Sequence, residues 1–185
     1  MEITTIALIL IVLCIIYSIG VYNKLVSLRH SIHNAWGQID IQLKRRYDLI
    51  PNLVETVKTF MKHEKETLHN VIEARNRAVS ASGVHEKAEA EQQVAGSLAN
   101  FFAVAESYPE LRSNQNMLSL QEELKSTENK ISFARQYYND TVTLFNVKIR
   151  SFPDMIVAQA GNFKPEELFD IEEPQARKNV KLDFD

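Results

Sequence analysis

The sequence of 185 residues contains a single cysteine, Cys14, which excludes an intramolecular disulfide framework and a cysteine-rich zinc module. It has only 5 glycines and 5 prolines, too few to punctuate the many short strands of an all-β protein. An excess of charge is also missing, because 21 Lys and Arg residues stand against 24 Asp and Glu residues. The resulting net charge of −3 leaves no basic footprint for nucleic acid. These absences favour one all-α domain without a nucleic-acid partner.

Sequence motifs for catalysis are lacking as well. His63-Glu64 begins like the zinc-protease motif H-E-x-x-H, but the position of the second histidine is occupied by Thr67. His69 follows His63 by six residues, so the two histidines would not share a helix face. The sequence has no G-x-S-x-G motif and no glycine-rich phosphate loop. We therefore predict no catalytic residue, no metal site, no cofactor and no enzymatic activity.

One long hydrophobic run is present at the N-terminus. Residues 3–22 contain no charged side chain, and at 1.5 Å rise per residue they would cover the bilayer core of about 30 Å. A cleaved signal peptide and a lipoprotein signal at Cys14 are the alternatives. The first lacks a basic segment before the run, and the second has bulky Leu13 where a small residue is expected. We predict a retained anchor over residues 1–22 that contacts membrane lipid through residues 3–22.

The flanking charges predict how this anchor is oriented. No Lys or Arg precedes the run, whereas Lys24 and Arg29 follow it closely. Positive charge next to a span is typical of the cytoplasmic side. We expect a single-pass protein of the cytoplasmic membrane, with its N-terminus outside and its C-terminal domain in the cytoplasm.

Residues 23–163 carry a helical period. The first amphipathic stripe continues from the anchor without a glycine-proline break, and we expect a kink or a new helix start at Pro51. Further breaks are expected at residues 80–83 and at Tyr108-Pro109. We predict a transmembrane helix continuous with an antiparallel bundle of three to four long helices. The most regular seam comprises Met117, Leu120, Leu124, Thr127, Ile131, Ala134, Tyr138, Thr141 and Phe145.

Residues 164–185 differ in character from the rest. They contain 4 basic and 7 acidic residues, and this accounts for the whole net charge. We predict a mostly irregular, acidic C-terminal tail. Two alternatives stay open for it: disorder, or docking on the bundle through Phe163, Leu168 and Phe169.

Several sequence blocks together resemble the LemA family. The longest is residues 39–58, IDIQLKRRYDLIPNLVETVK, which follows Ala35-Trp36. The resemblance implies a bacterial inner-membrane protein with one N-terminal span and a long-helix bundle in the cytoplasm. The family implies no catalytic residues that could be transferred to this chain. The other blocks are residues 22–26, 105–111, 120–124 and 127–129, with Tyr138-Asn139 and Phe152-Pro153.

Within these blocks we single out residues for interaction or packing. The basic cluster Lys44-Arg45-Arg46 lies roughly 33 Å beyond the span on a continuous helix, well outside a Debye length of about 8 Å. We therefore favour ion pairs with Asp40, Asp48 or another subunit over contacts to lipid headgroups. The bulky residues serve either core packing, with Pro51 kinking the helix and Asn52 covering exposed backbone groups, or an interface. The full candidate set is Trp36, Lys44, Arg45, Arg46, Tyr47, Pro51, Asn52, Tyr108 and Pro109.

Long helices expose more apolar edge than a small bundle can bury, so we expect homo-oligomerisation. The function that follows is a non-enzymatic, membrane-anchored scaffold that self-associates at the inner membrane, in envelope organisation or stress. The alternative is a monomeric adaptor that binds a membrane protease or another envelope-stress membrane protein. The identity of the partner, the subunit number and the biological signal are left open by the sequence.

Overall fold

A computed structural model describes residues 2–170 of the chain. Over these residues the protein is all-helical and contains no strand, which confirms the predicted fold class. The helices are α1 (Glu2–Val57), α2 (Lys65–Ser80), α3 (Val84–Ala105), α4 (Pro109–Arg112), α5 (Gln115–Arg150) and α6 (Asp154–Ala160).

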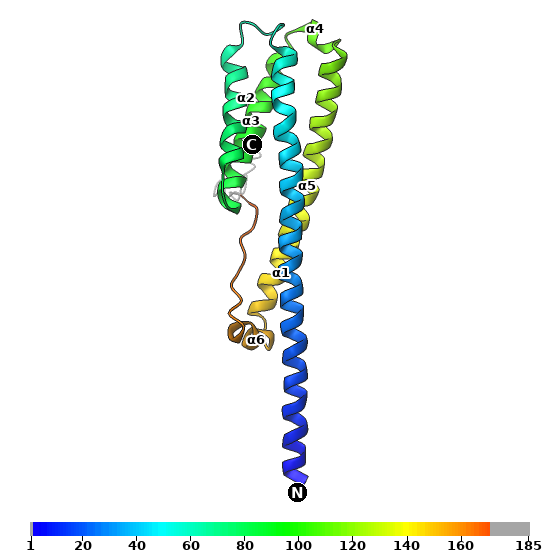
Figure 1. Ribbon diagram of the computed structural model, residues 1–185, viewed down its shortest axis with the longest axis vertical. Helices are drawn as coiled ribbons and strands as arrows, with labels where there is room; N and C mark the ends of the chain where they lie inside the picture. Colours follow the sequence, from blue (N-terminus) through cyan, green and yellow to red (C-terminus); the bar gives the residue numbers. More distant parts are fainter. Residues whose placement is uncertain (1, 171–185) are drawn as a thin grey trace, which may run out of the picture.

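Helix α1 determines the length of the molecule. Its 56 residues correspond to about 84 Å at 1.5 Å per residue. Figure 1 shows that the other helices lie beside its upper part, whereas its N-terminal part stands alone. Helix α1 contains an apolar window of the length and composition of a membrane span, and the side chains of this window are exposed. The N-terminal third of α1 is therefore compatible with a membrane anchor, as the sequence predicts.

The core lies where one face of α1 meets the other helices. Helix α5 packs along α1, and α2 packs with α3 on the opposite side of α1 (Figure 1). The stripe expected on α1 is buried, and so is most of the seam expected on α5. Each fully buried Leu or Ile contributes about 1.5–3 kcal/mol, so these faces supply much of the stability. The buried stripe of α1 includes Leu25, Leu28, Ile32, Ala35, Ile39 and Leu43.

Pro51 does not start a new helix. Helix α1 continues through it and ends at Val57. A proline has no N–H, so the carbonyl of Tyr47, one turn earlier, loses its helical donor. The Nε of Arg75, on α2, donates to that carbonyl at 3.2 Å. The expected restart at Pro51 is therefore wrong, and Arg75 rather than Asn52 covers the freed backbone group.

Residues 161–170 leave α6 and run back along α1 and α5 without helical structure. Phe163 and Phe169 are buried, whereas Leu168 is 44% exposed. The docking alternative for the start of the tail is therefore the one that the structure supports, through the two phenylalanines. Residues 171–185, the remainder of the predicted tail, lie outside the described residues.

Candidate functional site

Four charged and polar side chains meet between three helices. Arg46, Tyr47 and Glu91 are buried, whereas the side chain of Glu128 is 52% exposed. Arg46 and Tyr47 come from α1, Glu91 from α3 and Glu128 from α5. The guanidinium of Arg46 donates to the carboxylates of Glu91 and Glu128, and the Tyr47 hydroxyl donates to Glu91. Arg46 is only 2% exposed and Glu91 only 4%. The cluster therefore ties α1, α3 and α5 together in one register.

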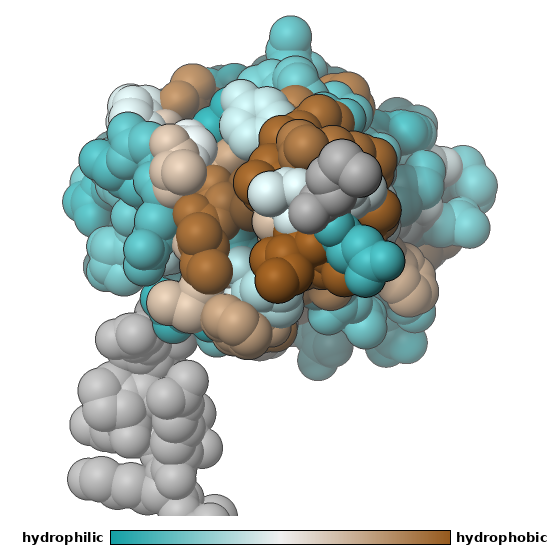
Figure 2. Space-filling model, turned by 90° about the horizontal axis from the view of Figure 1, so that it is seen from below, coloured by the Kyte–Doolittle hydropathy of each residue, from teal (hydrophilic) through white to brown (hydrophobic). Residues whose placement is uncertain are grey.

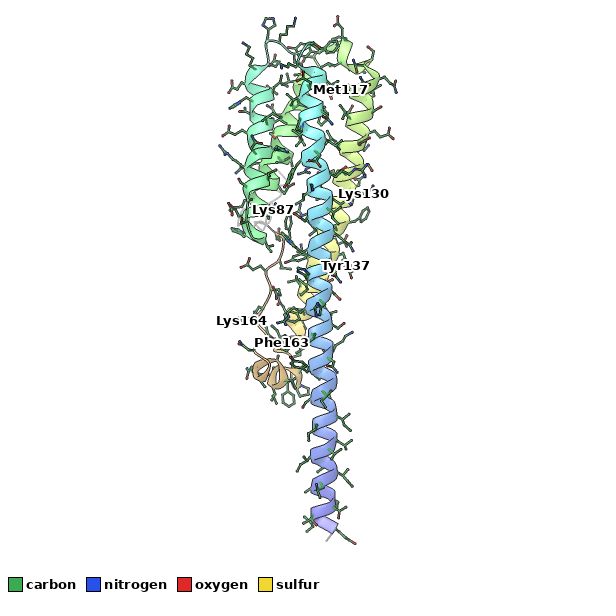
Figure 3. The ribbon with its side chains drawn as sticks, viewed as in Figure 1. Lys87, Met117, Lys130, Tyr137, Phe163 and Lys164 are labelled. Atoms are coloured by element: carbon green, nitrogen blue, oxygen red, sulfur yellow. The ribbon has the colours of Figure 1, made fainter. Side chains whose placement is uncertain are left out.

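Burial sets the electrostatics of this cluster. Desolvation raises the pKa of Glu91, although the charge of Arg46 and the hydrogen bond from Tyr47 act in the opposite direction. Desolvation and the neighbouring Glu91 carboxylate raise the pKa of Tyr47, so the phenol stays protonated as a donor. Lys87, labelled in Figure 3, places its Nζ 5.8 Å from the centre of the Tyr47 ring. The arrangement resembles a structural ion-pair network more than a catalytic pair, because each carboxylate already has a partner. We call Arg46, Tyr47, Glu91 and Glu128 the lock.

Two polar atoms on α1 are buried without a hydrogen-bond partner among the described residues, namely the Nε of Arg46 and the Oε1 of Gln42. An unpaired buried polar atom is costly, typically about 1–3 kcal/mol. Arg46 borders a cavity of about 390 Å³ between α3 and α5, and Gln42 borders a groove of about 430 Å³ between α1 and α5. The groove is therefore a place where an incoming polar group would find an acceptor.

The three cations of the predicted basic cluster have different surroundings. Arg46 is buried in the lock, Arg45 lies 4.0 Å from Glu123 of α5, and Lys44 is exposed. Arg45 and Arg46 therefore pair with carboxylates on α3 and α5 of the same chain. Within the chain, the expected partners Asp40 and Asp48 are not the ones that these two arginines contact, because helix packing brings other carboxylates closer. Pairing with another subunit stays a prediction.

Trp36 and Tyr108 both make packing contacts. The Trp36 ring lies 5.6 Å from the Tyr138 ring and 5.8 Å from the Phe169 ring, measured between centroids. Tyr108 caps α4 and donates from its hydroxyl to Glu64 at 2.9 Å, which joins the α3–α4 turn to the start of α2.

The three remaining candidates lie at the surface. Pro109 is the first residue of α4, a position where its missing N–H costs nothing. Pro51 and Asn52 are exposed on α1. None of these positions joins the buried lock.

An exposed apolar stripe, which we call the outer stripe, runs along the α1–α5 side. On α5 it lies nearly opposite the buried seam, and Figure 3 shows Lys130 and Tyr137 on this side of α1. We did not predict the outer stripe from the sequence, because the regular seam alone explained why this segment forms a packed helix. The signal that could have revealed the stripe is a second set of apolar residues on α5 outside that seam. The outer stripe consists of Ile41 (65% exposed), Phe133 (73%), Tyr137 (52%), Leu144 (54%) and Val147 (57%).

A second surface feature lies at the end of the molecule farthest from the N-terminus. An open hollow of about 1050 Å³ lies between the end of α1 and the start of α2. Its floor is apolar, with Met61 and Leu68, and both His63 and His69 line it. Among the described residues, no group of three or more His, Cys, Asp or Glu side chains could hold a metal ion.

Together these features define an all-helical protein with a long apolar N-terminal helix and no assembled catalytic constellation in the part that the structure describes. The LemA family model matches residues 35–184, and the chain belongs to the LemA family. It is also similar to the protein LemA of Metamycoplasma hominis, with 26% identity over 172 residues that cover 90% of this chain and 74% of that protein. The family match begins after the apolar segment, so it rests on the helices that contain the lock.

Proposed function

We propose that this LemA-family protein is a non-enzymatic, membrane-anchored scaffold that self-associates at the cytoplasmic face of the bacterial inner membrane, in envelope organisation or stress. Residues 3–22 would span the membrane with the N-terminus outside. The long helices beside α1 would form an antiparallel bundle in the cytoplasm. The observation that carries the proposal is the outer stripe, because several large apolar side chains exposed along one face typically mark an interaction surface, and three of them, Ile41, Phe133 and Tyr137, line one groove.

The direction of the outer stripe supports a lateral contact. The stripe follows α5 alongside α1, so it would run roughly along the membrane normal if α1 spans the bilayer. A shared anchor would hold every copy in the same orientation and at the same height. Two neighbouring copies would then present their stripes at the same level.

The absolute mass of the full-length protein tests this proposal. The protein would be extracted in a mild detergent and measured by light scattering corrected for bound detergent, with electron-microscope imaging of the same fraction. We expect a discrete assembly of several subunits that persists on dilution. A clean monomer over the whole concentration range would contradict the scaffold.

The adaptor is the second candidate, and the hollow at the far end of the molecule favours it. This hollow has an apolar floor and a rim with Lys58, Lys62 and Lys65, which is suited to an apolar segment with acidic flanks on a partner protein. A monomeric result would make the adaptor the leading proposal. Photo-crosslinking from position 69, at the rim, would then identify the partner in membranes.

A further inference from the structure

Helix α6 lies beside the part of α1 that we assign to the membrane. The Tyr17 hydroxyl donates to Asp154 Oδ1 at 2.6 Å, and the rings of Tyr22 and Phe163 lie 5.5 Å apart. Gly161 also lies against the Tyr22 ring. These contacts place α6 at the level of residues 17–22, inside the apolar run of residues 3–22. Figure 1 shows α6 at the lower end of the packed helices, next to α1.

The free length of α1 is shorter than a bilayer core. Helix α1 is unaccompanied from Glu2 to Ile16, and at 1.5 Å per residue this stretch covers about 22 Å. The hydrocarbon core of a bilayer is about 30 Å thick. A shortfall of about 8 Å lies within the depth of about 5–10 Å at which interfacial helices lie in a leaflet. If α1 spans the bilayer, α6 is drawn down to the headgroup region.

The side chains at this end of the molecule suit that position. Phe152, in the turn just before α6, is 78% exposed, and Ile156 on α6 is 60% exposed. Figure 2 looks onto this end and shows hydrophobic residues gathered there around the start of α1, with hydrophilic residues outside them. Tyr17 and Tyr22 bring aromatic rings to the same level, where tyrosines are enriched in membrane proteins.

Charges at this end are either paired or suited to lipid headgroups. The only carboxylate of α6, Asp154, accepts from Tyr17 and from Lys148 Nζ, the latter at 2.6 Å. It is therefore neutralised by an ion pair and turned away from the exposed face. Exposed cations lie close by, which would favour anionic lipid. They are Lys24 on α1, Arg150 at the end of α5 and Lys164, labelled in Figure 3 just after α6.

We propose that α6 is a second membrane contact, which inserts Phe152 and Ile156 into the headgroup region of the leaflet where α1 enters the cytoplasm. This inference rests on the proposed membrane anchor. Its occupant is a lipid surface, because the contacts with α1 fix α6 at the height of the bilayer boundary. The contact would hold the helical domain upright on the membrane rather than let it swing on a single helix.

Fluorescence quenching by lipids tests this directly. In a full-length Cys14→Ser background, single cysteines would be introduced by Ile156→Cys, Val79→Cys and Leu10→Cys, and each labelled with an environment-sensitive fluorophore. Val79 is the control, since it is an exposed aliphatic residue (49% against 60% for Ile156) on α2, at the level of Tyr47 and far from the anchor. The proteins would be reconstituted in vesicles of phosphatidylethanolamine and phosphatidylglycerol that contain lipids spin-labelled near the headgroup or deep in the acyl chain.

We expect severalfold stronger quenching at position 156 than at position 79, with the shallow spin label more effective than the deep one. The probe at position 10 should respond mainly to the deep label. Quenching at position 10 without quenching at position 156 would overturn the proposed contact of α6 with lipid but would still support the membrane anchor. Absence of quenching at position 10 would overturn both. A blue-shifted but unquenched probe at position 156 would show that a second copy covers α6, which also overturns the lipid contact.

Discussion

Arg46 is a long charged residue in a run of basic side chains, yet packing places it at the centre of the molecule. Its neighbours Lys44 and Arg45 are exposed, because successive residues of a helix point about 100° apart and only one of the three faces α3 and α5. Burying the guanidinium is possible because Glu91 and Glu128 accept from it. Such a pair adds little net stability, but it makes the register of three helices specific.

We predict that Arg46→Ala destabilises the protein by about 3–5 kcal/mol, because it leaves the Glu91 carboxylate buried without its cation. The matched control is Arg45→Ala, whose partner Glu123 lies 4.0 Å away with both side chains about half exposed. Loss of such a surface pair costs at most about 1 kcal/mol. Thermal and urea unfolding of the full chain in detergent, followed by circular dichroism, measures both variants. An equal loss of unfolding free energy in the two variants would contradict the structural role of the lock.

The loss of stability in Arg46→Ala should also depend on pH, and the direction of this dependence follows from the pKa of Glu91. The folded-state pKa of Glu91 is raised, so this residue contributes stability that is fully present below its unfolded pKa and is lost as the pH rises through the folded pKa. The charge of Arg46 lowers the folded-state pKa of Glu91, so the substitution Arg46→Ala raises this pKa further. The stability gap between wild type and variant should therefore be widest near neutral pH. It should narrow as the pH falls toward the ordinary glutamate pKa of about 4.3. A gap that widens on acidification would exclude Glu91 as its source.

At the scale of elements, the segment after α6 is held by side chains of α5 rather than by secondary structure. Asn146 accepts from the backbone N–H of Glu166 at 2.9 Å and donates to its carbonyl at 2.8 Å. Asn139 makes the same pair of bonds with Phe169, at 2.8 and 3.2 Å. Asn139 and Asn146, seven residues apart on one helix face, thus bond to the backbone of residues 166–169. Each uses its side-chain amide in the way that a neighbouring β-strand would use its backbone amide.

Burial makes a second contribution at this segment. The Phe169 ring is buried 5.8 Å from the Trp36 ring, and the guanidinium of Arg135 lies 4.8 Å from its centre. Tyr138 also donates from its hydroxyl to the Glu167 carbonyl at 2.8 Å, and burial raises its pKa to about 12. The phenol therefore remains a donor over the physiological pH range.

We predict that Phe169→Ala releases this segment and leaves the long helices folded. Replacing a buried phenylalanine costs about 3–5 kcal/mol, and each 1.4 kcal/mol is tenfold in an equilibrium constant. Hydrogen exchange at the amides of Glu166 and Phe169 should therefore accelerate by roughly 100-fold or more, up to the limit of full exposure. The control is Leu168→Ala, at a neighbouring exposed position. Similar protection in both variants would show that the asparagine bonds alone hold the segment.

At the scale of the whole molecule, α5 has two apolar faces, and residues 2–170 cover only one of them. The buried seam packs against α1, and the outer stripe faces outward. A helix with apolar residues on two sides is expected to have a partner on each. In the proposed assembly, the second partner is the neighbouring copy held at the same height by its anchor.

We predict that Phe133→Glu combined with Leu144→Glu lowers the mass of the full-length protein in detergent from the assembly to the monomer, since two charges would have to be buried at the contact. The helix content should be unchanged, because both side chains are exposed. Val79→Glu is the control, as an exposed aliphatic residue on α2 away from the outer stripe. An assembly of unchanged mass in the double variant would exclude the outer stripe as the contact.

Local periodicity in the sequence was enough to predict helical structure, the apolar first helix and the buried faces of α1 and α5, but not the break between Val57 and Lys65 that separates α1 from α2. Those features depend on spacings of three and four residues and on the lack of charge over residues 3–22, which are visible along the chain. The family resemblance, confirmed by the match over residues 35–184, could likewise be read from residues 39–58. The same local reasoning misplaced the effect of Pro51, because the donor that compensates for it, Arg75, lies on another helix.

Tertiary structure alone decided which residues meet across the helices. The partners of Arg46 lie 45 and 82 residues away in the sequence, and the docking of Phe169 depends on Asn139, 30 residues earlier. No spacing rule connects positions so far apart, because their proximity depends on the turns and on the packing of whole helices. The level of α6 beside Tyr17 is of the same kind, since a contact over 137 residues sets it. The sequence by itself therefore determined the elements and their buried faces, whereas the fold determined the lock, the outer stripe and the height of α6.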